Sequence, residues 1–298
     1  MTTQHEGPLS GQIGLVTGAG RGIGQAIALS LAAAGMHVVA TARSPDEIEE
    51  TAAMARGAGG SASALTLDVR SRQAVDAVVA EVLGQFGRID LLVNNAGSNS
   101  ALGPVWEVDP DLWLQDIEVN LYAPFLLCRA VLPSMIAAGG GRVINIMGGG
   151  LTGPLPYDTG YSSSKAGASR FTETLAIEAA PHNVKVFAMG PGVVATRMNR
   201  HVFDSPEGRK WHGALETQLE GRWVGPEHAA RLATRLALGE ADPLIGRMLG
   251  IADDLEAMLA NIDEIRAHEL HTMRLVTSVA GHAPAIPLTA VEGGREPG

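Results

Sequence analysis

A short apolar run, a glycine-rich turn and a helical pattern follow one another near the start of the chain. Residues 12–17 read as a buried strand, and residues 25–34 read as a helix. The turn between them, at positions 18–24, has the sequence GAGRGIG. Such a turn lets the backbone approach a diphosphate, and the helix N-terminus offers N–H groups and a positive dipole end. Although ordinary loops also contain glycine, this context predicts a dinucleotide-binding turn made by Gly18, Gly20, Arg21, Gly22, Ile23 and Gly24.

Apolar runs and helical patterns alternate along most of the chain. Further strands are expected at residues 37–41, 64–69, 89–94, 142–147, 184–189 and 244–251. Apolar residues make up 46% of the chain and aromatic residues only 4%, which suits Val- and Ile-rich strands between Ala-rich helices. The 298 residues therefore predict an α/β fold of one large domain or two small ones.

The end of the second strand indicates which dinucleotide the turn binds. A site for NAD usually places Asp or Glu there, to accept a hydrogen bond from the ribose 2′-hydroxyl. This strand instead ends in TARS, with Arg43 and no acid. Arg43 and Arg21 suit the 2′-phosphate of NADP, although both could also be solvated surface arginines. We therefore expect NADP(H) rather than NAD(H) as the cofactor.

Tyr161 and Lys165 are the candidate acid–base residues. Their spacing of four places both side chains on one face of a helix. An unperturbed tyrosine has a pKa of about 10, and a nearby lysine ammonium lowers that pKa by favouring the phenolate. The pair is therefore a candidate proton donor or acceptor near neutral pH, and the plainer alternative is an exposed helix start.

Polar and small residues follow several other strands. Asp68 can accept a hydrogen bond from an adenine amino group, or it can cap the next helix. The NNAG turn at 94–97 suits contact with a flat ligand, although such clusters also make ordinary turns. Asn120 lies in an apolar helical segment and needs partners, either as a bridge to water near the site or as a satisfied residue beside Pro124.

The chain after the sixth strand holds the candidate substrate site. The Pro-Gly turn at 190–196 can close over a planar ring, with Thr196 bonding a carboxamide or capping the next helix. Residues 197–224 read as an irregular lid, and its Met198 and Trp211 favour a medium or large, partly aromatic substrate such as a polyketide. Residues 253–276 read as one long helix, and the Pro- and Gly-rich tail at 282–298 is expected to be disordered.

Charge and composition argue against several other functions. The net charge of −10 disfavours a surface for nucleic acid or anionic membrane. The sequence has no apolar run of transmembrane length and no signal-peptide pattern, so we expect a cytoplasmic protein without a membrane partner. The single cysteine, Cys128, forms no intramolecular disulfide, and the scattered histidines form no metal-ligand cluster.

The order and spacing of these motifs resemble those of the short-chain dehydrogenase/reductase family. The shared motifs are the glycine-rich turn, NNAG, Asn120, the YSSSK segment at 161–165 and the Pro-Gly turn, over about residues 11–253. The resemblance implies a single-domain Rossmann-like fold, a doubly wound parallel sheet of about seven strands with helices on both faces. It also implies that Tyr161 is the general acid/base, that Lys165 binds the nicotinamide ribose and lowers the pKa of Tyr161, and that Asn120 holds a proton-relay water.

The same resemblance implies the remaining cofactor contacts and the assembly. Cofactor contacts beyond the glycine-rich turn and Arg43 are assigned to Asp68, Val69, Asn94, Ala96, Gly97, Tyr161, Lys165, Pro191, Gly192, Val194 and Thr196. A homodimer or homotetramer is expected, through the helices around Asn120 and after Lys165. Residues 1–253 would form the domain, 254–280 its C-terminal helical extension and 281–298 the tail.

One position departs from the family pattern. The family places a catalytic Ser about thirteen residues before the Tyr, and this chain has Gly148 there. Losing such an oxyanion donor typically costs about 10²–10³ in rate. Thr152 or the N–H groups of the neighbouring glycines are the candidate replacements, and Gly148 is expected to open room for a bulky substrate. The predicted substrate pocket comprises Gly148, Gly149, Thr152, Met198 and Trp211.

Two functions follow from this departure. The first is an NADPH-dependent carbonyl reductase or alcohol dehydrogenase, acting on a medium or large ketone or quinone. The second is a non-redox cyclase, isomerase or dehydratase that retains the cofactor site. The complete set of cofactor motifs favours the first, and a cofactor-binding protein without turnover is disfavoured because Tyr161, Lys165 and Asn120 are all present.

Overall fold

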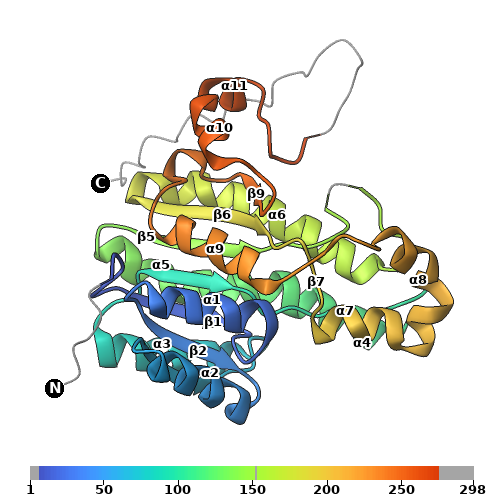
Figure 1. Cartoon of the computed structure of the whole chain (residues 1–298), viewed down its shortest axis with the longest axis horizontal. Coiled ribbons are helices and arrows are strands. Elements are labelled where there is room, and N and C mark those ends of the chain that lie inside the picture. The colour runs from blue at the N-terminus through green and yellow to red at the C-terminus, as the bar shows by residue number, and fades with distance from the viewer. Residues whose placement is uncertain (1–6, 152, 275–298) are drawn as a thin grey trace, which may run out of the picture.

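Seven parallel strands form the central sheet of the protein. The structure is a computed structural model that describes residues 7–151 and 153–274, so Thr152 and the tail from residue 275 lie outside the described residues. Within those ranges the strand order is β3-β2-β1-β4-β5-β6-β9 (Figure 1). The strands are β1 (Ile13–Thr17), β2 (His37–Ala42), β3 (Ser61–Thr66), β4 (Leu91–Asn94), β5 (Gly141–Ile146), β6 (Val184–Gly190) and β9 (Met248–Gly250).

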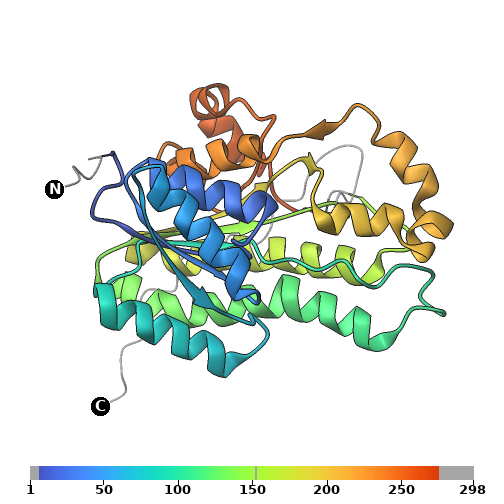
Figure 2. The same cartoon turned by 60° about the horizontal axis from the view of Figure 1, so that its bottom comes forward.

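Helices cover both faces of this sheet, as Figure 2 shows. One face carries α1 (Gly22–Ala33), α2 (Pro45–Gly57) and α9 (Pro226–Ala237), and the other carries α3 (Arg72–Phe86), α5 (Ala123–Ala137) and α6 (Thr159–Ala179). Ile27 and Leu236 belong to the core on the first face, and Leu127 and Leu175 belong to the core on the second. The predicted doubly wound Rossmann-like sheet is therefore confirmed.

The sheet reverses its winding at β1, which lies between β2 and β4. Val16 of β1 is paired with Ala40 on one side and with Val93 on the other. In open parallel sheets, ligands bind outside the carboxyl ends of the strands at such a reversal. The loops after β1, β2 and β4 therefore open into one region.

Several element boundaries differ from the sequence predictions. Strand β3 spans Ser61–Thr66 rather than 64–69, because His37, Ser61 and Ser63 join β2 to β3 through side-chain hydrogen bonds at its start. The predicted helix at 253–276 is two short helices, α10 (Leu255–Ala260) and α11 (Ile262–Ala267), because Asn261 leaves helical geometry between them.

The predicted irregular lid is mostly helical. It consists of β7 (Val193–Val194), α7 (Arg197–Asp204), α8 (Pro206–Gln218) and β8 (Trp223–Val224), where β7 and β8 form a two-stranded sheet. Val202 and Phe203 are buried against Leu102 of the body, and this one-sided apolar pattern stabilises α7 as a helix. Helices α7 and α8, residues 197–218 together, project from the sheet as an arm (Figure 1).

A long apolar helical stretch runs through the second face. Helix α4 (Pro110–Ile117), a π-helical turn (Glu118–Tyr122) and α5 continue without interruption, with a mean hydropathy of 1.4 in the most apolar window. By length and composition alone this stretch could cross a membrane, although Asp116, Glu118 and Asn120 interrupt its apolar sequence. Core helices of soluble proteins have the same length and composition, and Leu127 and Val131 of this stretch are buried in the core on the second face of the sheet.

Candidate active site

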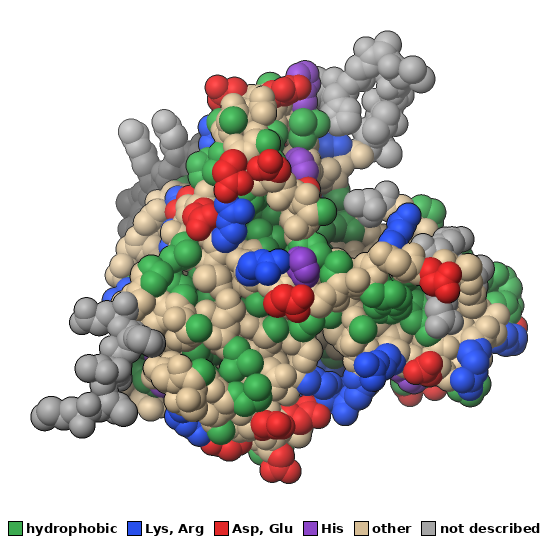
Figure 3. Space-filling view, in the orientation of Figure 1, with side chains coloured by type: hydrophobic (Ala, Val, Ile, Leu, Met, Phe, Trp, Pro, Cys, Tyr) green, Lys and Arg blue, Asp and Glu red, His purple; other side chains and the backbone are tan. Residues whose placement is uncertain are grey.

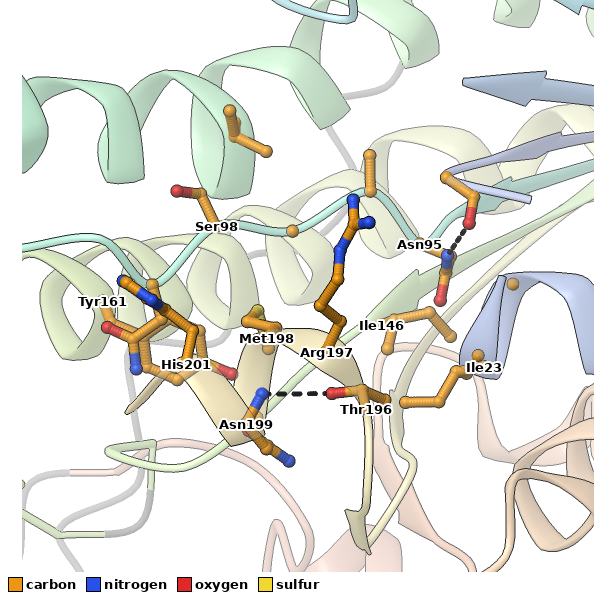
Figure 4. Close-up of a pocket in the computed structure, with 18 of the residues that line it drawn as sticks. Ile23, Asn95, Ser98, Ile146, Tyr161, Thr196, Arg197, Met198, Asn199 and His201 are labelled. Atoms are coloured by element: carbon orange, nitrogen blue, oxygen red, sulfur yellow. Dashed lines mark hydrogen bonds between the residues drawn. The ribbon is translucent and has the colours of Figure 1, made fainter. Parts of the chain in front are cut away.

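A cavity of about 1030 Å³ opens at the carboxyl ends of the strands. It lies in the hollow between the sheet body and the α7–α8 arm, where Lys and Arg side chains gather (Figure 3). In Figure 4, Arg197, Met198, Asn199 and His201 of α7 lie across from Asn95 and Ser98 of the loop after β4. One wall of this cavity therefore comes from the arm and the other from the sheet.

Most predicted site residues meet at this cavity. Those lining it are Gly18, Gly20, Arg21, Gly22, Ile23, Gly24, Arg43, Asp68, Val69, Ala96, Gly97, Gly148, Gly149, Tyr161, Lys165, Pro191, Gly192, Thr196 and Met198. Residues from seven separate segments of the sequence therefore converge on one cavity.

The glycine-rich turn needs its glycines for close packing. Gly18 has a φ of +62°, and a Cβ on Gly24 would lie 2.3 Å from the Gly18 carbonyl oxygen. The Asn95 side-chain amide donates to the carbonyls of Thr17 and Gly18 at 2.8 and 3.1 Å. Asn95 therefore fixes the turn against β4, a role that the sequence analysis did not assign although the NNAG motif contains it.

Three arginines surround the outer end of the glycine-rich turn. Arg21 donates to both carboxylate oxygens of Glu47 at 2.7 Å, and Arg197 of α7 lies 3.6 Å from the same carboxylate. Arg43 lines the same end and forms no ion pair among the described residues. An anionic group at this end could bind Arg43 and replace Glu47 as the partner of Arg21 and Arg197.

Asp68 and Val69 line the cavity after β3. Arg70 donates to both carboxylate oxygens of Asp68, at 3.1 and 2.7 Å. These hydrogen bonds lower the pKa of Asp68, so it is ionised at neutral pH. The alternative that Asp68 caps the next helix is wrong, because Ser71 caps α3, whereas the adenine contact of Asp68 stays a prediction.

The Tyr161 hydroxyl lies against Gly148. Tyr161 is 7% exposed, and a Cβ on Gly148 would be only 1.9 Å from its Oη atom. Lys165 is also buried, with Nζ donating to the Ile146 carbonyl at 2.9 Å and lying 5.8 Å from the Tyr161 ring centroid. The space beside Gly148 is therefore filled by Tyr161 rather than left open for substrate, which corrects the expectation from sequence.

Burial dominates the titration of this pair. Burial raises the pKa of Tyr161, and the nearby carboxylates of Asp158 and Asp116 raise it further. Burial also lowers the pKa of Lys165 to about 8. The predicted lowering of the Tyr161 pKa by Lys165 is not found, because the loss of hydration outweighs the attraction of an ammonium that lies over the ring face.

Of the predicted site residues that the structure describes, four do not line the cavity. Asn120 is buried and internally satisfied, because its amide donates to the Ser98 carbonyl and to Ser164 while its oxygen accepts from the Ser98 N–H. Asn94 donates to Asn145 within the sheet. Val194 pairs with β8, and Trp211 of α8 packs on Tyr157 at a centroid distance of 4.8 Å.

Thr196 has a structural role at the cavity. Thr196 lines the cavity and caps α7, since its hydroxyl accepts from the Asn199 N–H at 3.2 Å (Figure 4). No group of three or more His, Cys, Asp or Glu residues that could hold a metal occurs within residues 7–151 and 153–274.

Sequence analysis missed an acidic residue in the cavity wall. Asp158 is fully buried, and burial raises its pKa to about 7. Only its position three residues before Tyr161, on the same helical face, pointed to it.

Comparisons with known proteins agree with this geometry. The sequence model of the family described as short chain dehydrogenase matches residues 12–207. Dehydrogenase/reductase SDR family member 4 of Homo sapiens is 33% identical over 239 residues, covering 80% of this chain and 85% of that protein.

Two solved structures extend the comparison. A metagenomic short-chain oxidoreductase in complex with NADP is 35% identical, with a TM-score of 0.65, and covers 78% of this chain and 92% of that one. A variant of actinorhodin polyketide ketoreductase with NADPH is 32% identical, with a TM-score of 0.74, and covers 84% of this chain and 97% of that one.

A parallel sheet whose winding reverses beside a glycine-rich turn defines a dinucleotide-binding α/β protein. The sequence match and the similarity of whole structures make the assignment more specific. This chain belongs to the short-chain dehydrogenase/reductase family of oxidoreductases, which bind nicotinamide dinucleotides and small-molecule substrates.

Proposed function

We propose that the protein is an NADP(H)-dependent carbonyl reductase, or an alcohol dehydrogenase in the reverse direction, for a medium or large ketone or quinone. The observation that carries this proposal is the Tyr161 hydroxyl, which is buried at the cavity wall with a raised pKa. A phenol that stays protonated at neutral pH can protonate a carbonyl oxygen. A non-redox isomerase or dehydratase, which Gly148 would favour, needs instead a base that removes a proton from carbon.

The residues around the glycine-rich turn fit a dinucleotide with a 2′-phosphate. The open end of the turn at α1 offers backbone N–H groups to a diphosphate. Arg43 and Arg21 supply guanidinium groups at the outer end, as does Arg197 from the arm. The bound NADP and NADPH in the two related structures support the same preference.

The chain's own residues would act in one proton-transfer step. The reduced nicotinamide, when bound, supplies a hydride to the carbonyl carbon and becomes oxidised. Tyr161 donates its proton to the carbonyl oxygen, forming the alcohol. Lys165 stabilises the tyrosinate that remains, because its ammonium lies over the ring. The N–H groups of Gly148 and Gly149 replace the serine hydroxyl as donors to the substrate oxygen.

We also propose a cytoplasmic homo-oligomer. Tyr122 and Phe125 on the apolar helical stretch are 44% and 42% exposed, and Ile177 of α6 is 54% exposed. Exposed apolar side chains on neighbouring helices favour association with a second copy. Light scattering should give a dimer or tetramer, and Phe125→Glu should shift it towards monomer. A wild-type monomer would contradict this part of the proposal.

The proposed activity is tested with purified protein and a panel of ketones and quinones. NADPH and NADH are first titrated by fluorescence, and we expect tighter binding of NADPH. Loss of reduced-nicotinamide absorbance is then followed with each carbonyl compound. Consumption of NADPH with at least one compound is expected, whereas conversion of a substrate without NADPH consumption would favour the non-redox alternative.

A further inference from the structure

Unpartnered hydrogen-bond acceptors cluster beside Tyr161. Both carboxylate oxygens of Asp158, the Oδ1 atom of Asn99 and the Nε2 atom of His212 are buried and have no hydrogen-bond partner among the described residues. Asp158 and Asn99 line the cavity, and His212 Nε2 lies 3.7 Å behind, facing Asp158 Oδ1. Buried polar atoms are nearly always hydrogen-bonded, so this cluster calls for a donor from outside the protein.

The backbone holds the Asp158 carboxylate away from its ordinary local partner. Asp158 occupies the N-cap position of α6, but its side chain makes no capping hydrogen bond. The preceding residue, Tyr157, has a φ of +68°, which is an uncommon conformation for a non-glycine residue. His212 bonds the backbone of Tyr157, and Trp211 packs on the Tyr157 ring. Helix α8 therefore stabilises the strained residue that directs Asp158 into the cavity.

Among the described residues, no donor lies within ordinary hydrogen-bond distance of either Asp158 oxygen. Asp116 of α4 is acidic and already accepts from Ser98 and from the Ser100 and Ala101 N–H groups. Tyr161 lies on the same helix as Asp158, and burial lowers the pKa of His212. Burial raises the pKa of Asp158 to about 7 against the opposing effect of the nearby Asn99 amide, and the charge of Asp116 raises it further. The carboxylate therefore forms within the neutral pH range.

An apolar surface lies across the cavity from this cluster. Val202 and Phe203 of α7 pack with Leu215 of α8 and with Leu219, the residue that follows α8, and all four side chains line the cavity. A substrate could therefore place an apolar ring against the arm and a polar group against Asp158.

We propose that Asp158, with Asn99 and His212, binds a hydroxyl group next to the reacting carbonyl, so that the substrates are hydroxyketones. This inference rests on the proposed reductase activity, because Tyr161 protonates the carbonyl of the same molecule. The substrate hydroxyl donates to Asp158, and its apolar remainder contacts α7 and α8. A plain ketone would leave the buried acceptors without a donor, which disfavours its binding.

The test compares two ketones that differ only in this hydroxyl, 2-hydroxyacetophenone and acetophenone, with NADPH. Loss of one hydrogen bond to a charged group lowers an affinity by about 10–100-fold. We therefore expect the kcat/KM of the wild type to be higher for 2-hydroxyacetophenone than for acetophenone by this factor. Asp158→Asn should bring the two ketones to within about threefold, chiefly through KM. Any effect of the lost charge on Tyr161 is common to both ketones and cancels in their ratio.

Two further variants and the pH dependence sharpen this test. His212→Gln should reduce the preference in the same direction but by less, because His212 lies behind the carboxylate. Asp111→Asn, on the exposed side of α4, is the matched control and should leave the preference unchanged. The preference should also increase between about pH 6 and 8, as the Asp158 carboxylate forms.

A binding measurement separates failure of this inference from failure of the reductase proposal. The dissociation constants of 1-phenyl-1,2-ethanediol and 1-phenylethanol are measured with oxidised NADP by tryptophan fluorescence. Equal affinities in the wild type, or a preference that persists in both Asp158→Asn and His212→Gln, would overturn the hydroxyl site. A diol preference that Asp158→Asn removes, without reduction of either ketone, would support the site and overturn the reductase proposal.

Discussion

The two ends of the cavity differ in how completely the protein satisfies its own polar groups. At the cofactor end, Asn95 bonds the glycine-rich turn, Thr51 donates to the Ala19 carbonyl, and Arg21 is paired with Glu47. At the substrate end, Asp158 and Asn99 keep buried atoms without partners. The first end is organised before any ligand arrives, whereas the second depends on its ligand for hydrogen bonds. This contrast suits a family that shares a cofactor and differs in substrates.

The largest expected effect separates proton transfer from cofactor binding. Tyr161→Phe removes the only proposed proton donor to the carbonyl, so kcat should fall by about 10³–10⁴. NADPH affinity should change by less than about threefold, because the ring and its contact with Lys165 remain. Tyr122→Phe, on the exposed helical stretch, is the control and should keep full activity. Full activity in Tyr161→Phe would remove the acid role from Tyr161.

The Asp158 carboxylate at the substrate end of the cavity should lower the free energy of unfolding. Asp158 has a raised pKa in the folded protein, so its stability contribution is present below about pH 4 and lost as pH rises through about 7. Asp158→Asn removes this penalty and should increase the free energy of unfolding by at most about 4 kcal/mol above pH 7. Chemical denaturation at about pH 8 and pH 4 measures the difference. A gain of equal size at both pH values would show that the carboxylate charge is not its cause.

The Gly148→Ser variant, which restores the family serine, tests whether the Tyr161 hydroxyl needs the space that a glycine at position 148 leaves. A Cβ at position 148 would meet the Tyr161 hydroxyl at 1.9 Å, so Gly148→Ser must displace the catalytic atom. We expect kcat/KM to fall by about 10–100-fold, since misplacement by about 1 Å has effects of this order. Gly153→Ser, where a Cβ meets no atom within 4 Å, is the control from the same loop. An increase in activity for Gly148→Ser would mean that Tyr161 has room to move.

The smallest expected effect concerns the cofactor end. Arg43→Asp should weaken NADPH binding by about tenfold, because an exposed charge pair is worth only about 1 kcal/mol and the new acid repels the phosphate. NADH binding should be unchanged or tighter, since Asp can accept from the ribose hydroxyl. Titration of both cofactors measures this, with Arg129→Asp on α5 as the control. Equal losses for both cofactors would exclude a contact between Arg43 and the 2′-phosphate.

The sequence located those parts of the cavity that are built from residues close together in the chain. The glycine-rich turn, Arg43 and the Tyr161–Lys165 pair are each local patterns with a specific backbone setting, and all of them line the cavity. The helical nature of the arm was missed because its apolar positions gain meaning only when Val202 and Phe203 meet Leu102.

The electrostatics of the site could not be predicted in the same way. The spacing of Tyr161 and Lys165 predicted a lowered tyrosine pKa, but burial and two acids reverse that shift. Likewise, Asp158 meets His212, and Glu47 meets Arg197, only through the folded chain. Burial and contacts between distant segments decide these shifts, and neither is encoded in local spacing.

The central claim is that Tyr161 and the cofactor reduce a carbonyl without the family serine. The most direct test uses NADPH deuterated at the transferred position of nicotinamide C4, with a ketone from the panel, and follows the product by mass spectrometry and NMR. Our account predicts one alcohol formed for each NADPH oxidised, with deuterium on the former carbonyl carbon. Conversion of the substrate with no deuterium transferred and no NADPH consumed would contradict it and indicate a non-redox enzyme.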